Sequence, residues 1–200
     1  MSTGRQYSRV LPMLGAFLCG LLLVFGAVVY LSGRSAPIGP AIAAVGGPFH
    51  LEDQNGKPFG DQDMKGRPFL VFFGFTHCPD ICPTTLFDIS QIMSKLGLDA
   101  DRTGALFITV DPERDTPAVL KDYLSNFDPH LRGLTGDAAA VNAVLKAYRV
   151  YAKKVPLEGG DYTMDHTAIV YLMDKDGHFV APFNMKQPPE AAAAQLRRYL

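Results

Sequence analysis

The sequence predicts an α/β fold with a mixed central sheet, and three patterns support this prediction. Two continuous apolar runs, at 67–75 and 105–112, have the composition of strands buried on both faces of a sheet. Segments with apolar residues at helical spacing follow these runs at 83–97 and 116–127. Strands and helices therefore alternate along the chain, as α/β folds require.

An apolar run near the N-terminus precedes the predicted domain. Residues 10–31 form an uncharged stretch of 22, close to the ~20 residues that a helix needs to cross a bilayer. A cleaved secretory signal usually has a shorter apolar core of roughly 7 to 15 residues. We therefore expect a transmembrane anchor, with a cleaved signal as the alternative because the small residues at 41–43 would suit cleavage. Arg5 and Arg9 predict that residues 1–9 stay in the cytoplasm.

The chain beyond the anchor is predicted to comprise a linker at 32–48 and one domain at 49–200. The linker is rich in Gly, Pro, Ser and Ala and carries one charge. Without Arg5, Arg9 and Arg34, 16 basic residues face 20 acidic residues, a formal charge of −4. This balance argues against nucleic-acid binding, which needs a basic face.

The domain is predicted to open with a hairpin at 49–59. Its Asn-Gly pair at 55–56 tolerates the positive φ of a tight turn. After the first buried strand, a helix at 83–97 has Pro83 in its first turn, where a missing N–H costs nothing, and ends at Gly97.

The second half of the domain repeats the strand and helix pattern. Thr116, followed by a proline, is a typical cap for the helix at 116–127. The remaining elements are a strand at 131–136, a helix at 137–150, two strands in 166–183 and an Ala-rich helix at 188–200. This order fits a thioredoxin-like fold.

Two cysteines, Cys78 and Cys82, lie in the loop between the strand at 67–75 and the helix at 83–97. Open α/β sheets bind ligands outside the carboxyl ends of their strands. The helix N-terminus favours thiolate over thiol, which would make Cys82 a good nucleophile or ligand. A structural disulfide is the simpler alternative, but so short a link constrains the unfolded chain little. Cys19, inside the apolar run, is interpreted as a lipid-facing or packing residue rather than a ligand.

A third ligand is sought among five histidines. His166 follows Asp165 and begins the apolar strand HTAIVYL, where a polar ring needs a partner. The other histidines are most simply solvated or point away from the cysteines, namely His50, His77, His130 and His178. Two thiolates and one imidazole suit Cu(I), Cu(II) or Zn(II), although zinc normally takes a fourth ligand. Met164 could be a weak axial ligand but is expected to be a packing residue.

Three segments, GFTHCPDICPTTL, TVDPERDTPAVL and DYTMDHTAIVYLMDKDGHFV, follow the predicted span in this order. With them the chain resembles the SCO/SenC family of copper chaperones for cytochrome c oxidase assembly. The resemblance implies one copper ion per domain, Cu(I), Cu(II) or both, bound through Cys78, Cys82 and His166. It also implies that Asp165 orients the histidine and that the loop at 157–164 is a mobile flap that carries it.

The resemblance further implies a role without catalytic residues, in maturing the binuclear copper site of oxidase subunit II. We expect a single-pass protein of the bacterial inner membrane with its domain in the periplasm. Its partners would be subunit II and other periplasmic copper chaperones or thiol reductants. The rival function is a membrane-tethered thiol-disulfide oxidoreductase, with a redox-active disulfide between Cys78 and Cys82, that reduces the oxidase cysteines. A thiol peroxidase is a weaker alternative because no peroxide-holding arginine can be assigned.

Overall fold

The computed structural model describes residues 17–28, 30 and 45–200. It divides into two units, Met1–Ile42 and Ala43–Leu200. In the first unit, residues 17–28 are helical and their side chains are exposed. Within the described ranges, no helix has both the length and the apolar character that a membrane crossing needs. The predicted N-terminal tail at 1–9 and parts of the predicted span at 10–31 and linker lie outside the described residues, so the anchor stays a prediction.

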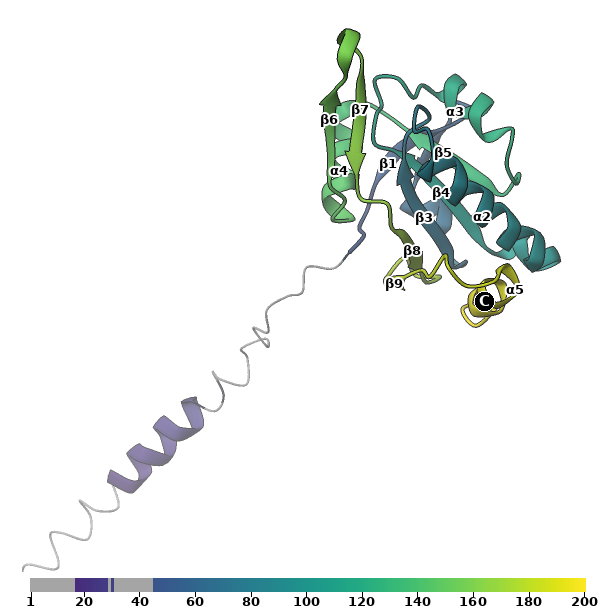
Figure 1. The fold of residues 1–200 in the computed structure, drawn as a ribbon. Coiled ribbons are helices and arrows are strands. Elements are labelled where there is room, and N and C mark those ends of the chain that lie inside the picture. Colours follow the sequence, from purple (N-terminus) through teal and green to yellow (C-terminus); the bar gives the residue numbers. More distant parts are fainter. Residues whose placement is uncertain (1–16, 29, 31–44) are drawn as a thin grey trace, which may run out of the picture. The chain divides into compact units, whose positions relative to one another are not determined.

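The second unit contains a seven-stranded mixed sheet with the strand order β2-β1-β5-β4-β3-β8-β9 (Figure 1). Strands β3, β4 and β5 are parallel, whereas β1 and β8 run antiparallel to their neighbours β5 and β3. The strands are β1 (His50–Asp53), β2 (Pro58–Gly60), β3 (Phe69–Gly74), β4 (Gly104–Thr109), β5 (Leu131–Thr135), β8 (Val170–Met173) and β9 (Phe179–Pro182). The prediction of a mixed central sheet is confirmed.

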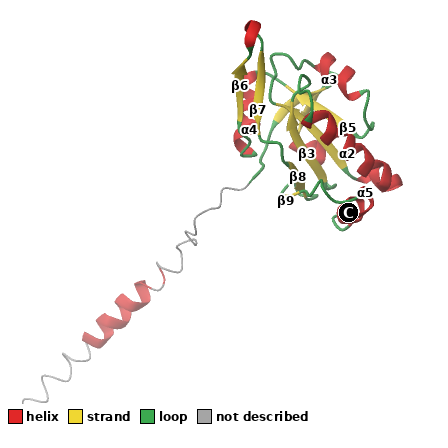
Figure 2. Cartoon of the chain, viewed as in Figure 1, coloured by secondary structure: helices red, strands yellow, loops and turns green. Residues whose placement is uncertain are grey.

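Four α-helices of the described domain accompany this sheet, and Figure 2 colours all helices red. They are α2 (Ile81–Leu96), α3 (Pro117–Leu124), α4 (Ala138–Ala147) and α5 (Pro189–Arg197). Helix α2 packs with α5, α3 lies against β5, and α4 lies against β1. The caps follow the sequence: the side chains of Thr116 and Asp137 accept hydrogen bonds from the N–H groups of Val119 and Ala140.

The core explains why the two apolar runs form the central strands. Every residue of β3 and β4 is buried, as expected for strands covered on both faces. The predicted hairpin is also present, since β1 and β2 pair antiparallel and Gly56 has a φ of 72° in the turn between them.

Helix α2 begins two residues earlier than predicted, at Ile81 rather than Pro83. Pro83 is tolerated there because the first N–H groups of a helix have no intrahelical partner. Cys82 therefore lies inside the first turn of the helix rather than before it.

The segment before β8 differs most from the prediction. Residues 152–166 form a separate two-stranded hairpin of β6 (Ala152–Pro156) and β7 (Tyr162–His166). The prediction that His166 begins the apolar strand is wrong, because it ends β7 and β8 starts at Val170. The predicted flap at 157–164 is likewise divided between the hairpin turn and β7. The signal was missed because β6 is largely exposed and carries two lysines instead of an apolar alternation.

Candidate metal centre

The candidate site lies where β3 ends and α2 begins. Because β3 and β4 are parallel, their carboxyl ends meet at one edge of the sheet, the usual ligand-binding edge of open α/β folds. The loop after β3 carries Cys78, and the first turn of α2 carries Cys82. The end of β7 brings His166 to the same edge, so three chain segments meet there.

Cys82 is the most deeply buried of the three side chains, with no exposed surface. Gly74 at the end of β3 makes room for it, since a Cβ on this glycine would lie 2.8 Å from the Cys82 sulfur. Burial raises the pKa of the Cys82 thiol, and the neighbouring Cys78 raises it further. The sequence predicted a thiolate favoured by the helix N-terminus, whereas burial of Cys82 in the metal-free protein favours the thiol.

His166 is half-buried between aromatic rings. Its imidazole meets Phe75 edge-on, with ring centroids 5.7 Å apart. Burial lowers the pKa of His166, although the Thr167 carbonyl and the Asp165 charge oppose the shift, so the ring is neutral at pH 7. Nδ1 lies 3.1 Å from the Thr167 carbonyl oxygen. An Nδ1–H that donates to this carbonyl leaves the Nε2 lone pair free to bind a metal.

The three candidate ligands converge on one another. Nε2 of His166 lies 3.6 Å from Sγ of Cys82, and the ligand atoms of Cys78, Cys82 and His166 all lie within 4.8 Å of one another. Two ligands each about 2.0–2.3 Å from one ion are roughly 3.5–4 Å apart, so the spacing fits a single metal. Two sulfurs and a neutral imidazole form a soft donor set that suits copper or zinc.

A cavity of ≈ 340 Å³ opens beside this group. It is lined by Phe75, Cys78, Pro79, Asp80, Ile81, Thr163, Met164, Asp165, His166 and Ala168.

Met164 is partly buried against the core, which agrees with the packing role expected for it. Asp165 is exposed, and its charge raises the pKa of His166 in opposition to burial. Its orienting role stays a prediction. His77 is exposed and lies outside the group of three.

Sequence reasoning missed a polar cluster that follows β4. The buried Asp115 carboxylate accepts hydrogen bonds from the Thr76 N–H and hydroxyl, at 3.1 and 2.6 Å, and from the Thr109 hydroxyl at 2.6 Å. It thereby fixes the loop that carries Cys78. The available signal was the run DPERD directly after a buried strand, since polar residues at that position face the ligand-binding edge.

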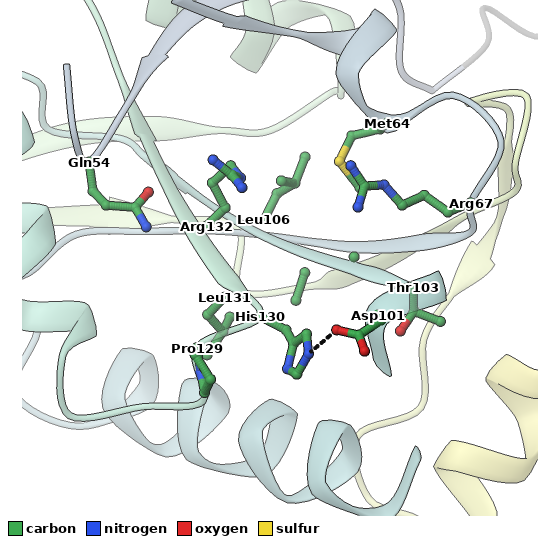
Figure 3. Close-up of a pocket in the computed structure, with 12 residues that line it drawn as sticks. Gln54, Met64, Arg67, Asp101, Thr103, Leu106, Pro129, His130, Leu131 and Arg132 are labelled. Atoms are coloured by element: carbon green, nitrogen blue, oxygen red, sulfur yellow. Dashed lines mark hydrogen bonds and ion pairs between the residues drawn. The ribbon is translucent and has the colours of Figure 1, made fainter. Parts of the chain in front are cut away.

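A second cavity of ≈ 170 Å³ lies at the opposite ends of β4 and β5 (Figure 3). His130 is set between Asp128 and Asp101, at 2.6 and 3.2 Å. Arg132 is paired with the buried Asp53 at 2.9 Å. The prediction that His130 is simply solvated is wrong, because two carboxylates bind it.

Several relatives match most of the chain. The protein is 41% identical to mitochondrial SCO2 of Saccharomyces cerevisiae over 160 residues, which cover 78% of this chain and 53% of the yeast protein. It thus spans about half the length of that relative. It is 39% identical over 174 residues to a SCO2-like protein of Rickettsia prowazekii, covering 82% of this chain and 85% of that protein.

Solved structures agree with these matches. Bradyrhizobium japonicum ScoI with copper bound is 64% identical, with a TM-score of 0.77 over 78% of this chain and 100% of that chain. Yeast Sco1 with copper bound is 40% identical, with a TM-score of 0.71 over 78% of this chain and 88% of that chain. The SCO1/SenC family model matches residues 39–200. With this match extending over the whole domain that holds the two cysteines and the histidine, the chain belongs to the SCO1/SenC family.

Proposed function

We propose that this protein binds one copper ion through Cys78, Cys82 and His166 and delivers it during cytochrome c oxidase assembly. The observation that carries the proposal is the convergence of two thiols and a neutral imidazole within 4.8 Å beside an open cavity. Solved relatives that are 64% and 40% identical have been determined with copper bound. A further relative, BsSco, is a member of the Sco family of cytochrome c oxidase assembly proteins.

The chemistry of the three ligands suits a metal that is passed on. Binding must release a proton from Cys82, whose pKa is raised by burial, so uptake becomes tighter as pH rises. His166 is neutral and loses no proton. The site offers three donors and an open side, where a ligand of the recipient could enter before the first donors leave.

The recipient and the location extend the proposal beyond the domain. We assign the binuclear copper site of oxidase subunit II as the recipient, and other periplasmic copper chaperones or thiol reductants as further partners. The apolar run at 10–31 would anchor the protein in the bacterial inner membrane. Arg5 and Arg9 would keep its N-terminus in the cytoplasm and leave the domain in the periplasm.

A second function, thiol-disulfide exchange, is supported by the closeness of the two thiols. Cys78 and Cys82 are free, and Cys78 is the more exposed of the two. The related BsSco, 26% identical with a TM-score of 0.63, has an identified disulfide switch. Exchange needs no imidazole, so His166 separates the two functions.

The test is a titration of the reduced full-length protein in detergent, without oxygen, with Cu(I) and with Cu(II). We expect one tight equivalent per chain. In His166→Ala, Cu(II) binding should weaken by more than ~100-fold, because even residues behind the ligands contribute 10–100-fold. Cu(I) should weaken much less, since it accepts two sulfur ligands.

The same variant should still be oxidised by a small-molecule disulfide. If the wild type binds two copper ions tightly per chain, or none, the copper proposal is wrong. Oxidase assembly that proceeds normally with His166→Ala at normal protein levels would favour the oxidoreductase.

A further inference from the structure

The hairpin that carries His166 is not part of the main sheet. Strands β6 and β7 pair only with each other and stand beside the seven-stranded sheet (Figure 1). Its backbone ladder therefore cannot fix its angle to the strand and loop that carry the cysteines. The angle is set by the chain link into β8, by packing of Ala152 and Met164 against the core, and by side-chain contacts at the far end of the hairpin.

Tyr162 supplies the most buried of these far-end contacts, and the exposed ion pair of Lys154 with Glu113 supplies another. Tyr162 is the first residue of β7, four residues before His166, so the two side chains point to the same face of the strand. Its hydroxyl donates to the buried Asp111 carboxylate at 2.9 Å. Its ring lies under the Arg114 guanidinium, with Cζ 3.7 Å from the ring centroid.

Arg114 joins the two partners. Its Nε donates to Asp111, and its Nη1 donates to the Tyr162 carbonyl at 2.9 Å and to Asp161 at 3.3 Å. The side chain is 18% exposed, so these charge-assisted bonds are only partly screened by water. One arginine thus binds the backbone, the ring and a side chain at the tip of the hairpin.

The same turn also binds the cysteine loop. Asp115, the next residue after Arg114, holds Thr76 two residues before Cys78. The segment 111–115 therefore contacts both the loop that carries Cys78 and the hairpin that carries His166. Through these two contacts the segment links the cysteine loop to the hairpin.

We propose that Arg114 is a positioning residue that holds the β6–β7 hairpin and so keeps His166 over the two cysteines. This inference rests on the proposed copper site. Its consequence is selective: Cu(II), which depends on the nitrogen ligand, needs the clamp formed by Asp111, Arg114 and Tyr162, whereas Cu(I) does not.

The experiment compares Arg114→Gln and Tyr162→Phe with wild type in the reduced full-length protein. Arg114→Gln should weaken Cu(II) by about 10–100-fold, the usual range for groups that orient a ligand, and change Cu(I) by less than about 3-fold. The electron paramagnetic resonance spectrum of its Cu(II) form should shift towards that of His166→Ala. Tyr162→Phe removes one hydrogen bond only and should act in the same direction with a smaller effect.

The matched control is Arg102→Gln, since Arg102 is an exposed arginine paired with Asp99 three residues away. It should leave both affinities unchanged. Hydrogen exchange of the metal-free protein gives a second reading: Arg114→Gln and Tyr162→Phe should speed exchange in β6–β7 but not in the hairpin of β1 and β2.

The outcomes separate the inference from the proposed function. A wild type without copper binding would overturn the function, while the exchange rates would still decide whether Arg114 holds the hairpin. Wild-type Cu(II) affinity and spectrum in both clamp variants would overturn the inference. Equal losses of Cu(I) and Cu(II) would also overturn it, because they indicate general destabilisation. Tyr162→Phe keeps the test decisive if Arg114→Gln leaves Asp111 unpaired and unfolds the domain.

Discussion

The two cavities at opposite ends of β4 differ in what their polar groups already bind. In the cavity of Figure 3, His130 contacts Asp101. Two carboxylates that the figure does not draw complete the pairing, Asp128 with His130 and Asp53 with Arg132. At the carboxyl end, the sulfurs of Cys78 and Cys82 and the nitrogen of His166 face one another. Charged groups that already have partners in the protein are not available to a ligand, whereas soft sulfur and nitrogen donors that face one another can bind a metal. The difference predicts that copper binds at the carboxyl end of β4, whereas the groups in the cavity of Figure 3 contribute to the stability of the fold.

The largest effect is expected from removing a sulfur ligand. Cys82→Ser replaces a soft thiol with a hard hydroxyl of similar shape, so Cu(I) affinity should fall by more than ~100-fold, beyond the loss for a group that only supports a ligand. Competition with a coloured Cu(I) chelator measures the change. Oxidation of Cys78 and Cys82 to a disulfide should have the same effect and be reversed by a thiol reductant.

The matched change at the other cavity is His130→Asn, which should leave copper affinity as it is in wild type. If copper uptake survives verified oxidation of both cysteines, the metal does not use them. Equal losses in Cys82→Ser and His130→Asn would remove the distinction between the two cavities.

The two ends of the sheet can also be compared through the stability of alanine variants at two glycines, Gly74 at the carboxyl end and Gly104 at the opposite end. A Cβ on Gly74 would lie 2.7 Å from the Phe107 ring and 2.8 Å from the Cys82 sulfur, both held firmly in the core. Overpacking of this kind costs about 1–3 kcal/mol of the free energy of unfolding. A Cβ on Gly104 would collide with the end of the Met64 side chain, which is flexible, and would lie 3.2 Å from Cβ of Phe69.

Urea unfolding should therefore show a clear loss for Gly74→Ala and a loss below ~1 kcal/mol for Gly104→Ala, partly offset by lower chain entropy in the unfolded state. Similar losses in both variants would mean that the carboxyl end of β3 is no more tightly packed than the opposite end of the sheet.

The same contrast explains what could be read from the sequence. The apolar runs and capped helices predicted most of the sheet, because β3 and β4 are buried along their whole length and so consist of consecutive, mostly apolar residues. The spacing of Cys78 and Cys82 indicated a site at the strand end, and His166 was found by its position beside the polar Asp165.

Three features could not be predicted from the sequence, each for a different physical reason. The β6–β7 hairpin is exposed and lacks an apolar alternation, so nothing local indicated strands. Arg114 and Tyr162 lie 48 residues apart, and only the fold brings them together. The raised pKa of Cys82 depends on how deeply the thiol is covered, which a motif at a helix start does not reveal.

The smallest effect is expected at His130. Burial alone would lower the pKa of His130, but the hydrogen bonds and charges of Asp128 and Asp101 raise it above its ordinary value of 6.5. A raised pKa in the folded state means that the protonated ring stabilises the fold. This stabilisation is complete below about pH 6.5, the pKa of an unfolded histidine, and is lost as pH rises through the higher folded value.

Urea unfolding between pH 5.5 and 8 should therefore show wild type losing stability relative to His130→Asn as pH rises. The loss should stay below ~1 kcal/mol, because the ring is partly exposed, Asp101 is largely exposed, and salt screens the pair. Asn is a suitable replacement since it can still donate one hydrogen bond to Asp128 but carries no titrating charge. If the two pH profiles run parallel, Asp128 and Asp101 do not stabilise the protonated form of His130, and the prediction for the cavity of Figure 3 is wrong.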